Sequence, residues 1–201
     1  GTEYLIAEGI ADPTKICMAG WSYGGYAALM SVIEDPERYR CVVSIAGVTD
    51  PKQLGLNSLR LVGGRSAQEF IGDEDEVLKQ GSPIKRVEEI KVPVLLVHGV
   101  EDATVPLTQS VTLAKALERA GRDVELIEYD SAQHSIVPER YRTDLLARLG
   151  VHADAGVGHA QHHVVARWEL PRVAGHSADG LVLVAYFSCM EFLAIYGLHR
   201  L

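Results

Sequence analysis

A serine flanked by glycines is the residue in this chain best placed for nucleophilic chemistry. The segment Gly20-Trp21-Ser22-Tyr23-Gly24-Gly25-Tyr26 contains the pattern G-x-S-x-G. The apolar run 15–19 before it favours a buried strand, and residues 27–30 behind it favour a helix. Such a sharp turn from strand to helix strains the serine backbone and requires neighbours without side chains. The pattern therefore predicts an exposed serine nucleophile, and the alternative interpretation is a glycine-rich turn with an incidental serine.

A serine hydroxyl needs a general base, and the base needs a carboxylate that orients it. Asp102 and His134 follow Ser22 along the chain, each a few residues after an apolar segment that predicts a strand. The carboxyl ends of parallel strands meet at one edge of a sheet, where ligands bind. We therefore expect Ser22, Asp102 and His134 to form a catalytic triad, with the backbone N–H of Tyr23 as one donor to the oxyanion.

Each partner of the serine has a rival in the sequence. Glu101 and Asp130 could replace Asp102, and His98 could replace His134. His98 stands at the end of a predicted strand and before a glycine, where packing is the more ordinary role. Asp130 is closer in sequence to His134 than a partner on a separate loop should be. Position therefore favours Asp102 and His134.

The elements that must hold these residues alternate regularly along the chain. The pattern predicts strands over 15–19, 41–46, 92–97 and 123–129, and helices over 4–10, 27–33, 107–120 and 139–149. The second strand is almost wholly apolar, as expected of a strand covered on both faces, whereas alternation in the fourth strand suits a sheet edge. We therefore expect an α/β fold with a mainly parallel sheet and flanking helices. The candidate serine, aspartate and histidine follow one another along the chain in the order found in α/β-hydrolases.

Composition excludes some classes of function. The chain is 47% hydrophobic and 23% charged, which is ordinary for a globular protein. Its net charge of −8 and its lack of a Lys and Arg cluster argue against a nucleic-acid partner. Cys17, Cys41 and Cys189 show no metal-ligand spacing, and a disulfide framework is not expected. Cys17 and Cys41 lie in predicted strands, where a free cysteine packs as a small apolar residue.

The sequence changes character after Leu149. Six of the eight histidines fall in residues 150–201, and none of the lysines does. The apolar segment 181–198 is at the length limit for a membrane helix. Three interpretations are an added core or partner-binding element, a weak membrane anchor, and a non-native tail from a frame slip or chimeric assembly. We favour the last, and divide the chain into a catalytic part, 1–149, and an atypical tail, 150–201.

A metal site in the tail is a further interpretation. His159 and His163 are one helical turn apart. Acidic residues nearby are few, and the composition of the tail explains the histidines equally well. No metal site is therefore predicted.

Three separated motifs resemble the catalytic domain of prolyl oligopeptidase family serine peptidases, with the acylaminoacyl- and dipeptidyl-peptidase branches the most similar. They are the serine segment 20–26, the segment 98–110 and the segment 129–134. The resemblance implies hydrolysis of short peptides through an acyl-enzyme, with no cofactor. It also implies that Tyr23 borders the substrate pocket, and that Val48 and Val105 line the pocket for the residue before the cleaved bond.

The chain departs from this family in two respects. Where relatives have aromatic residues after the second strand, it has Pro51, Leu54 and Ser58, so the preference of the pocket stays open. Relatives also carry an N-terminal β-propeller and the first hydrolase strands, which supply the second oxyanion donor. We interpret this chain as the C-terminal part of a catalytic domain and expect one uncovered sheet edge, low stability and little activity for the chain alone.

Two other functions stay open at this point. The same triad serves a carboxylesterase on the same fold, and a non-catalytic interaction fragment is the third possibility. A membrane partner is not favoured, and both a cytoplasmic and a periplasmic location remain open.

Overall fold

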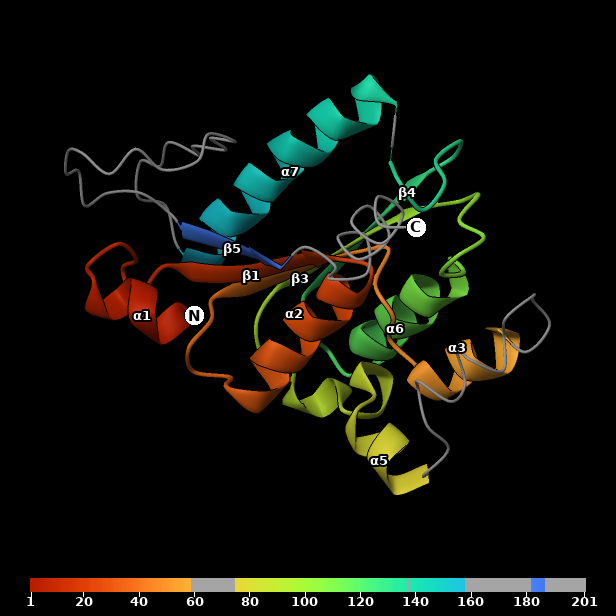
Figure 1. The fold of residues 1–201 in the computed structure, drawn as a ribbon, viewed down its shortest axis with the longest axis horizontal. Coiled ribbons are helices and arrows are strands. Elements are labelled where there is room, and N and C mark those ends of the chain that lie inside the picture. Colours follow the sequence, from red (N-terminus) through yellow and green to blue (C-terminus); the bar gives the residue numbers. More distant parts are fainter. Residues whose placement is uncertain (59–74, 137, 158–181, 187–201) are drawn as a thin grey trace, which may run out of the picture.

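A sheet of five parallel strands runs through the centre of the molecule (Figure 1). The computed structural model describes residues 1–58, 75–136, 138–157 and 182–186. The sheet has the order β4-β3-β2-β1-β5. Its strands are β1 (Ile16–Trp21), β2 (Cys41–Ile45), β3 (Val94–Gly99), β4 (Val124–Tyr129) and β5 (Val182–Tyr186). The four strands predicted from the sequence are therefore confirmed as neighbours in a parallel sheet.

Helices cover both faces of the sheet. Figure 1 shows α2 (Tyr23–Glu34) and α6 (Thr108–Arg119) on one side and α7 (Glu139–Val157) on the other. The remaining helical segments are α1 (Thr2–Ala7), α3 (Pro51–Ser58), α5 (Asp75–Gln80), η1 (Pro83–Lys85) and η2 (Val87–Glu89). Among the described residues, no helix is long and apolar enough to span a membrane. The arrangement is an α/β fold with flanking helices, as the sequence predicts.

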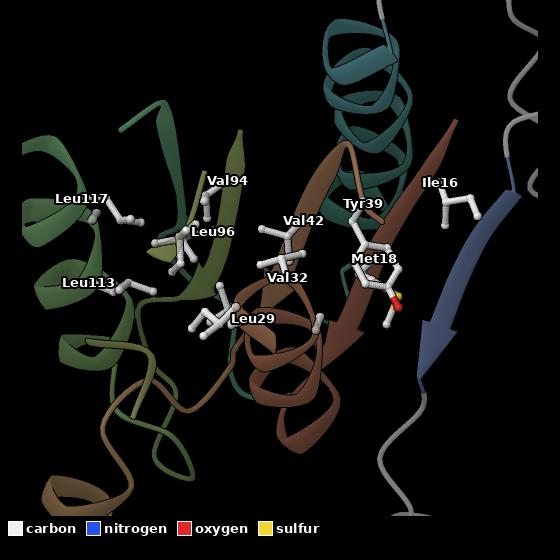
Figure 2. Packing of buried hydrophobic residues seen from close by; sticks show 14 of the residues in the cluster. Ile16, Met18, Leu29, Val32, Tyr39, Val42, Val94, Leu96, Leu113 and Leu117 are labelled. Atoms are coloured by element: carbon white, nitrogen blue, oxygen red, sulfur yellow. The ribbon is translucent and has the colours of Figure 1, made fainter. Parts of the chain in front are cut away.

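The central strands are apolar because both of their faces are buried. Successive side chains of a strand point to opposite faces. Met18, Val42 and Leu96 pack on the side of α2 and α6, as Figure 2 shows. Val43 and Leu95 belong to a second cluster, which includes residues of α7. The sheet is therefore a rigid platform from which the loops after β1, β3 and β4 emerge at one edge.

The C-terminus of α6 follows its sequence signal. Gly121 has φ 67°, a conformation that favours glycine. Its N–H donates to the carbonyl of Glu118 at 3.0 Å, and the N–H of Arg122 donates to that of Leu117 at 2.9 Å. Gly121 therefore caps the helix, and the chain turns directly into β4.

Helix α7 is longer than the sequence predicts. We expected it to end at Leu149, but it continues through Gly150 to Val157. A glycine in a helix costs only about 1 kcal/mol relative to alanine, and burial of Ala153 against Cys17 and Cys41 offsets that cost. The change in composition after Leu149 is therefore not the end of this helix.

Cys17 and Cys41 form a disulfide, so the expectation that they are free thiols was wrong. They face each other in register on β1 and β2, with their Cα atoms 4.7 Å apart. Both side chains are completely buried. The pairing depends on the register of two strands, which the separation of the cysteines along the chain does not reveal.

The edge of the sheet beside β1 is occupied, contrary to the expectation of an uncovered edge. β5 pairs with β1 from Ile16 opposite Val182 to Gly20 opposite Tyr186. The opposite edge is β4, whose alternating burial agrees with the prediction. His159, His163, Cys189 and most of the apolar segment 181–198 lie outside the described residues.

Candidate active site

Ser22 lies in the turn between β1 and α2, in a strained backbone conformation. Its φ is 57° and its ψ is −120°, values that residues with a side chain rarely adopt. The Ser22 N–H donates to the carbonyl of Ile45 at 2.8 Å, which anchors the turn to β2. A Cβ atom at Gly20 would lie 2.0 Å from the carbonyl oxygen of Gly24. The predicted sharp turn from strand to helix is confirmed, and only glycine fits at position 20.

The hydroxyl of Ser22 lies against the imidazole of His134, which in turn contacts Asp102. The Ser22 Oγ atom is 3.0 Å from His134 Nε2, and His134 Nδ1 is 2.7 Å from Asp102 Oδ2. An ionised carboxylate can only accept a hydrogen bond, so Nδ1 carries the hydrogen and donates a hydrogen bond to Asp102. Nε2 of the neutral ring therefore accepts a hydrogen bond from the serine hydroxyl.

Asp102 is held in its ionised form by the loop around it. The residue is 7% exposed, and its Oδ1 atom accepts the N–H groups of Thr104 at 2.8 Å and Val105 at 2.9 Å. Burial raises the pKa of Asp102, but hydrogen bonds from His134, His98 and the Val105 N–H outweigh it and hold that pKa below its ordinary value. Asp102 therefore presents a fixed, charged acceptor to His134.

The loops after β3 and β4 touch through their backbones. A Cβ atom at Gly99 would lie 2.3 Å from the carbonyl oxygen of Ala132, so this approach requires glycine. The N–H of Glu101 donates to that same carbonyl at 3.0 Å. This contact fixes the loop that carries Asp102 relative to the loop that carries His134.

Trp21 connects the serine turn to the histidine loop. Its Nε1–H donates to the backbone carbonyl of His134 at 3.0 Å. The two residues are 113 positions apart, so the sequence motif alone could not reveal the bond. Trp21, the residue before Ser22, thus holds the loop that carries His134 against the serine turn.

Of the three alternative residues, all within the described part of the chain, none forms a hydrogen bond with the Ser22 hydroxyl. Glu101 and Asp130 have exposed side chains. His98 is completely buried, and its Nδ1 and Nε2 atoms contact Ser110 Oγ at 2.7 Å and the Val105 carbonyl at 2.8 Å. The preference for Asp102 and His134 thus agrees with the contacts.

The predicted oxyanion and pocket residues lie around the serine turn. Tyr23 is the first residue of α2, where backbone N–H groups have no acceptor within the helix, and its side chain is 52% exposed. Val48 is half-buried in the loop after β2, and Pro51 and Leu54 lie in α3. Val105 is only 3% exposed. The pocket roles of Tyr23, Val48 and Val105 stay predictions.

A buried glutamine holds the loop after β2. Gln109, in the first turn of α6, accepts the N–H groups of Thr49 at 2.8 Å and Asp50 at 2.7 Å through Oε1. The Thr49 hydroxyl donates to the Gln109 carbonyl at 2.7 Å. The first turn of α6 therefore supports the loop after β2. Within the described ranges, no group of three His, Cys, Asp or Glu side chains could hold a metal ion.

Comparison with known proteins relates most of this chain to one family. Residues 1–155 match the model of the prolyl oligopeptidase family. Prolyl endopeptidase FAP of Mus musculus is 27% identical over 151 residues, which cover 72% of this chain and 19% of the relative. The acylamino-acid-releasing enzyme of Arabidopsis thaliana is 24% identical over 160 residues, covering 74% of this chain and 20% of the relative. The chain thus spans about a fifth of the length of these relatives.

Solved structures agree with the fold. The acylaminoacyl peptidase of Pyrococcus horikoshii superposes with a TM-score of 0.59 at 26% identity, over 67% of this chain and 22% of that protein. A puromycin-hydrolyzing peptidase of Mycobacterium tuberculosis superposes with a TM-score of 0.69 at 23% identity, over 78% of this chain and 24% of that protein. The second likeness concerns the fold alone.

Proposed function

The chain belongs to the prolyl oligopeptidase family, and we propose that it carries the acyl-transfer machinery of a serine peptidase, with Ser22 as nucleophile, His134 as general base and Asp102 as its orienting carboxylate. The observation that carries the proposal is the continuous contact from Ser22 Oγ to His134 Nε2 at 3.0 Å and from His134 Nδ1 to Asp102 Oδ2 at 2.7 Å. The strained backbone of Ser22 supports it, because that conformation projects the hydroxyl out of the turn.

The first half of the proposed reaction forms an acyl-enzyme. Ser22 Oγ attacks the carbonyl carbon of the substrate while its proton passes to His134 Nε2. Asp102 accepts the Nδ1–H of the resulting imidazolium and stabilises its charge. The Tyr23 N–H, at the positive end of α2, donates to the developing oxyanion. His134 then delivers its proton to the leaving amine, and the carbon–nitrogen bond breaks.

The second half releases the product. His134 takes a proton from water, whose oxygen attacks the acyl carbon of the ester on Ser22. Collapse of the second tetrahedral intermediate returns the proton to Ser22 Oγ and frees the carboxylic acid. No step requires a cofactor.

Peptides are the proposed substrates. The relatives are named for the release of acylamino acids and for prolyl endopeptidase action. An acylaminoacyl peptidase that superposes at 25% identity with a TM-score of 0.64 was solved in complex with Z-Gly-Gly-Phe-chloromethyl ketone. We propose that Tyr23 borders the substrate pocket and that Val48 and Val105 line the pocket for the residue before the cleaved bond.

An ester burst tests the proposed nucleophile. A blocked amino acid p-nitrophenyl ester should release one equivalent of p-nitrophenol per active serine, and Ser22→Ala should abolish the burst. Ser31→Ala is a matched control, because the Ser31 hydroxyl donates only to the Ala27 carbonyl within α2. A burst that survives in Ser22→Ala would refute the proposal. The ratio of peptide anilide to simple ester turnover separates a peptidase from a carboxylesterase.

A further inference from the structure

We propose that His98 is a positioning residue for Asp102: its buried imidazole, held by Ser110 of α6, fixes the carboxylate that His134 also contacts. The inference rests on the proposed function, since it concerns the same triad. It assigns a role to His98, which is not one of the three proposed triad residues.

His98 reaches the same carboxylate oxygen as His134 does. The His98 Nε2 atom lies 3.3 Å from Asp102 Oδ2, and His134 Nδ1 lies 2.7 Å from that oxygen. The side chains of His98 and Asp102 are both completely buried, whereas that of His134 is partly exposed. Two imidazoles therefore flank one carboxylate oxygen, one in the core and one facing the serine.

The contacts of His98 fix where its hydrogen lies. Its Nε2 atom is 2.8 Å from the Val105 carbonyl, which can only accept a hydrogen bond. Nε2 therefore carries a hydrogen, which it donates to the Val105 carbonyl, and the Nε2 atom itself lies 3.3 Å from Asp102 Oδ2. The Nδ1 atom is 2.7 Å from Ser110 Oγ, and in the neutral ring it accepts the serine hydroxyl. The Nε2–H group is thus a fixed donor to the loop that carries Asp102, and it lies beside the carboxylate.

The same bonds hold the loop that carries the carboxylate. Val105 accepts from His98 through its carbonyl and donates to Asp102 Oδ1 through its N–H. His98 therefore contacts Asp102 directly and also through the backbone of Val105. Because His98 is the penultimate residue of β3 and Ser110 lies in the first turn of α6, the loop is tied to two rigid elements.

Few charged groups face His98. Its neighbour in register on β4 is Glu128, an exposed side chain. Helix α6 contributes the neutral Ser110, and the loop after β3 contributes Asp102. Among these groups, the Asp102 carboxylate is therefore the buried charge beside His98 Nε2.

Two substitutions separate donation from packing. In His98→Gln the side-chain amide nitrogen can reach the position of Nε2, whereas in His98→Asn it reaches only that of Nδ1. Labelling of Ser22 by a fluorophosphonate should slow about tenfold or more in His98→Asn, because small displacements of a catalytic group cost that much. His98→Gln should stay within about threefold of the wild type, since a donor at the same place restores the contact.

A second variant and a spectroscopic measurement guard against misfolding. Ser110→Ala removes only the hydroxyl that holds His98 and should slow labelling about two- to fivefold, the effect of one neutral hydrogen bond, while Ser31→Ala should not. In proton NMR, the low-field resonance of the His134 Nδ1–H should persist in His98→Gln and broaden or shift in His98→Asn.

The outcomes distinguish this inference from the proposed function. Wild-type labelling rates and an unchanged resonance in both His98→Asn and Ser110→Ala would overturn the inference alone. Equal slowing in His98→Asn and His98→Gln, with wild-type melting temperatures, would also overturn it, because packing rather than donation would then matter. Labelling that survives in Ser22→Ala would instead overturn the proposed function.

Discussion

The two sides of Ser22 are held in different ways. Toward β2, β3 and β4, side chains and glycine contacts tie the serine turn to distant loops, as in the Trp21 bond to His134 and the close approach of Gly99 to Ala132. Toward β5, the described contact is a ladder of five residue pairs with β1. The first side is specified by particular side chains and the second by backbone pairing.

This difference separates the parts of the proposed reaction. Proton transfer depends on the first side, where Asp102 and His134 are each fixed by several contacts. Stabilisation of the oxyanion depends on the Tyr23 N–H in the serine turn and on the strand pairing that holds β1, which on this side is with β5. Changes to the side-chain contacts of the loops should therefore alter the reaction rate, whereas changes to the links between strands should alter the stability.

The largest expected effect is on the first side. Asp102→Asn should lower the rate of acyl-enzyme formation about 10⁴-fold, because an amide no longer holds His134 in the required tautomer. Stopped-flow measurement of the ester burst gives the rate. Asp130→Asn is the matched control and should leave it unchanged, since Asp130 is exposed. A loss in Asp130→Asn as large as that in Asp102→Asn would contradict the assignment.

The disulfide between β1 and β2 should contribute stability rather than rate. Cys17 and Cys41 are 24 positions apart, and closing a loop of that length stabilises a fold by about 3 kcal/mol. The double variant Cys17→Ala/Cys41→Ala should lower the free energy of unfolding in urea by about that amount. Cys189→Ala is the control. Equal stability of the double variant and the wild type would show that this bond contributes nothing.

Removal of β5 tests the second side of the serine. A chain ending at Val157 loses the ladder with β1, and we expect about 2 kcal/mol less stability from the lost hydrogen bonds and the exposed edge. Thermal unfolding monitored by circular dichroism measures the change. An equal or higher melting temperature would instead favour the interpretation of residues 150–201 as a non-native tail.

The smallest effect concerns the bond between Trp21 and His134. Trp21→Phe keeps an aromatic ring and removes the indole N–H, which should cost about 1 kcal/mol, or about fivefold in the rate of serine labelling. Trp168→Phe serves as the control. Should Trp21→Phe react as fast as the wild type, the bond does not position the base.

The sequence predicted the parts of the site that depend on local patterns. Ser22 was found from its glycine neighbours, and Asp102 and His134 from their places after apolar strands. The start of β3 was less well predicted: the strand begins at Val94 rather than at residue 92, since Pro93 has no N–H to donate to a neighbouring strand.

The contacts that depend on register and long-range packing could not be predicted. The Cys17–Cys41 disulfide requires β1 and β2 to pair in one particular register, and the Trp21 bond requires two loops far apart in sequence to meet. The continuation of α7 to Val157 depends on burial of Ala153, which outweighs the glycine before it. In each case the contact is set by tertiary packing, which the local sequence pattern does not record.

The most direct test of the proposed triad is the intact mass of the chain after reaction with a fluorophosphonate. We predict a single adduct, mapped to Ser22 by peptide sequencing, because the Ser22 hydroxyl lies within hydrogen-bond distance of His134 Nε2, which can take its proton. An adduct on another residue, or one that persists in Ser22→Ala, would contradict the account.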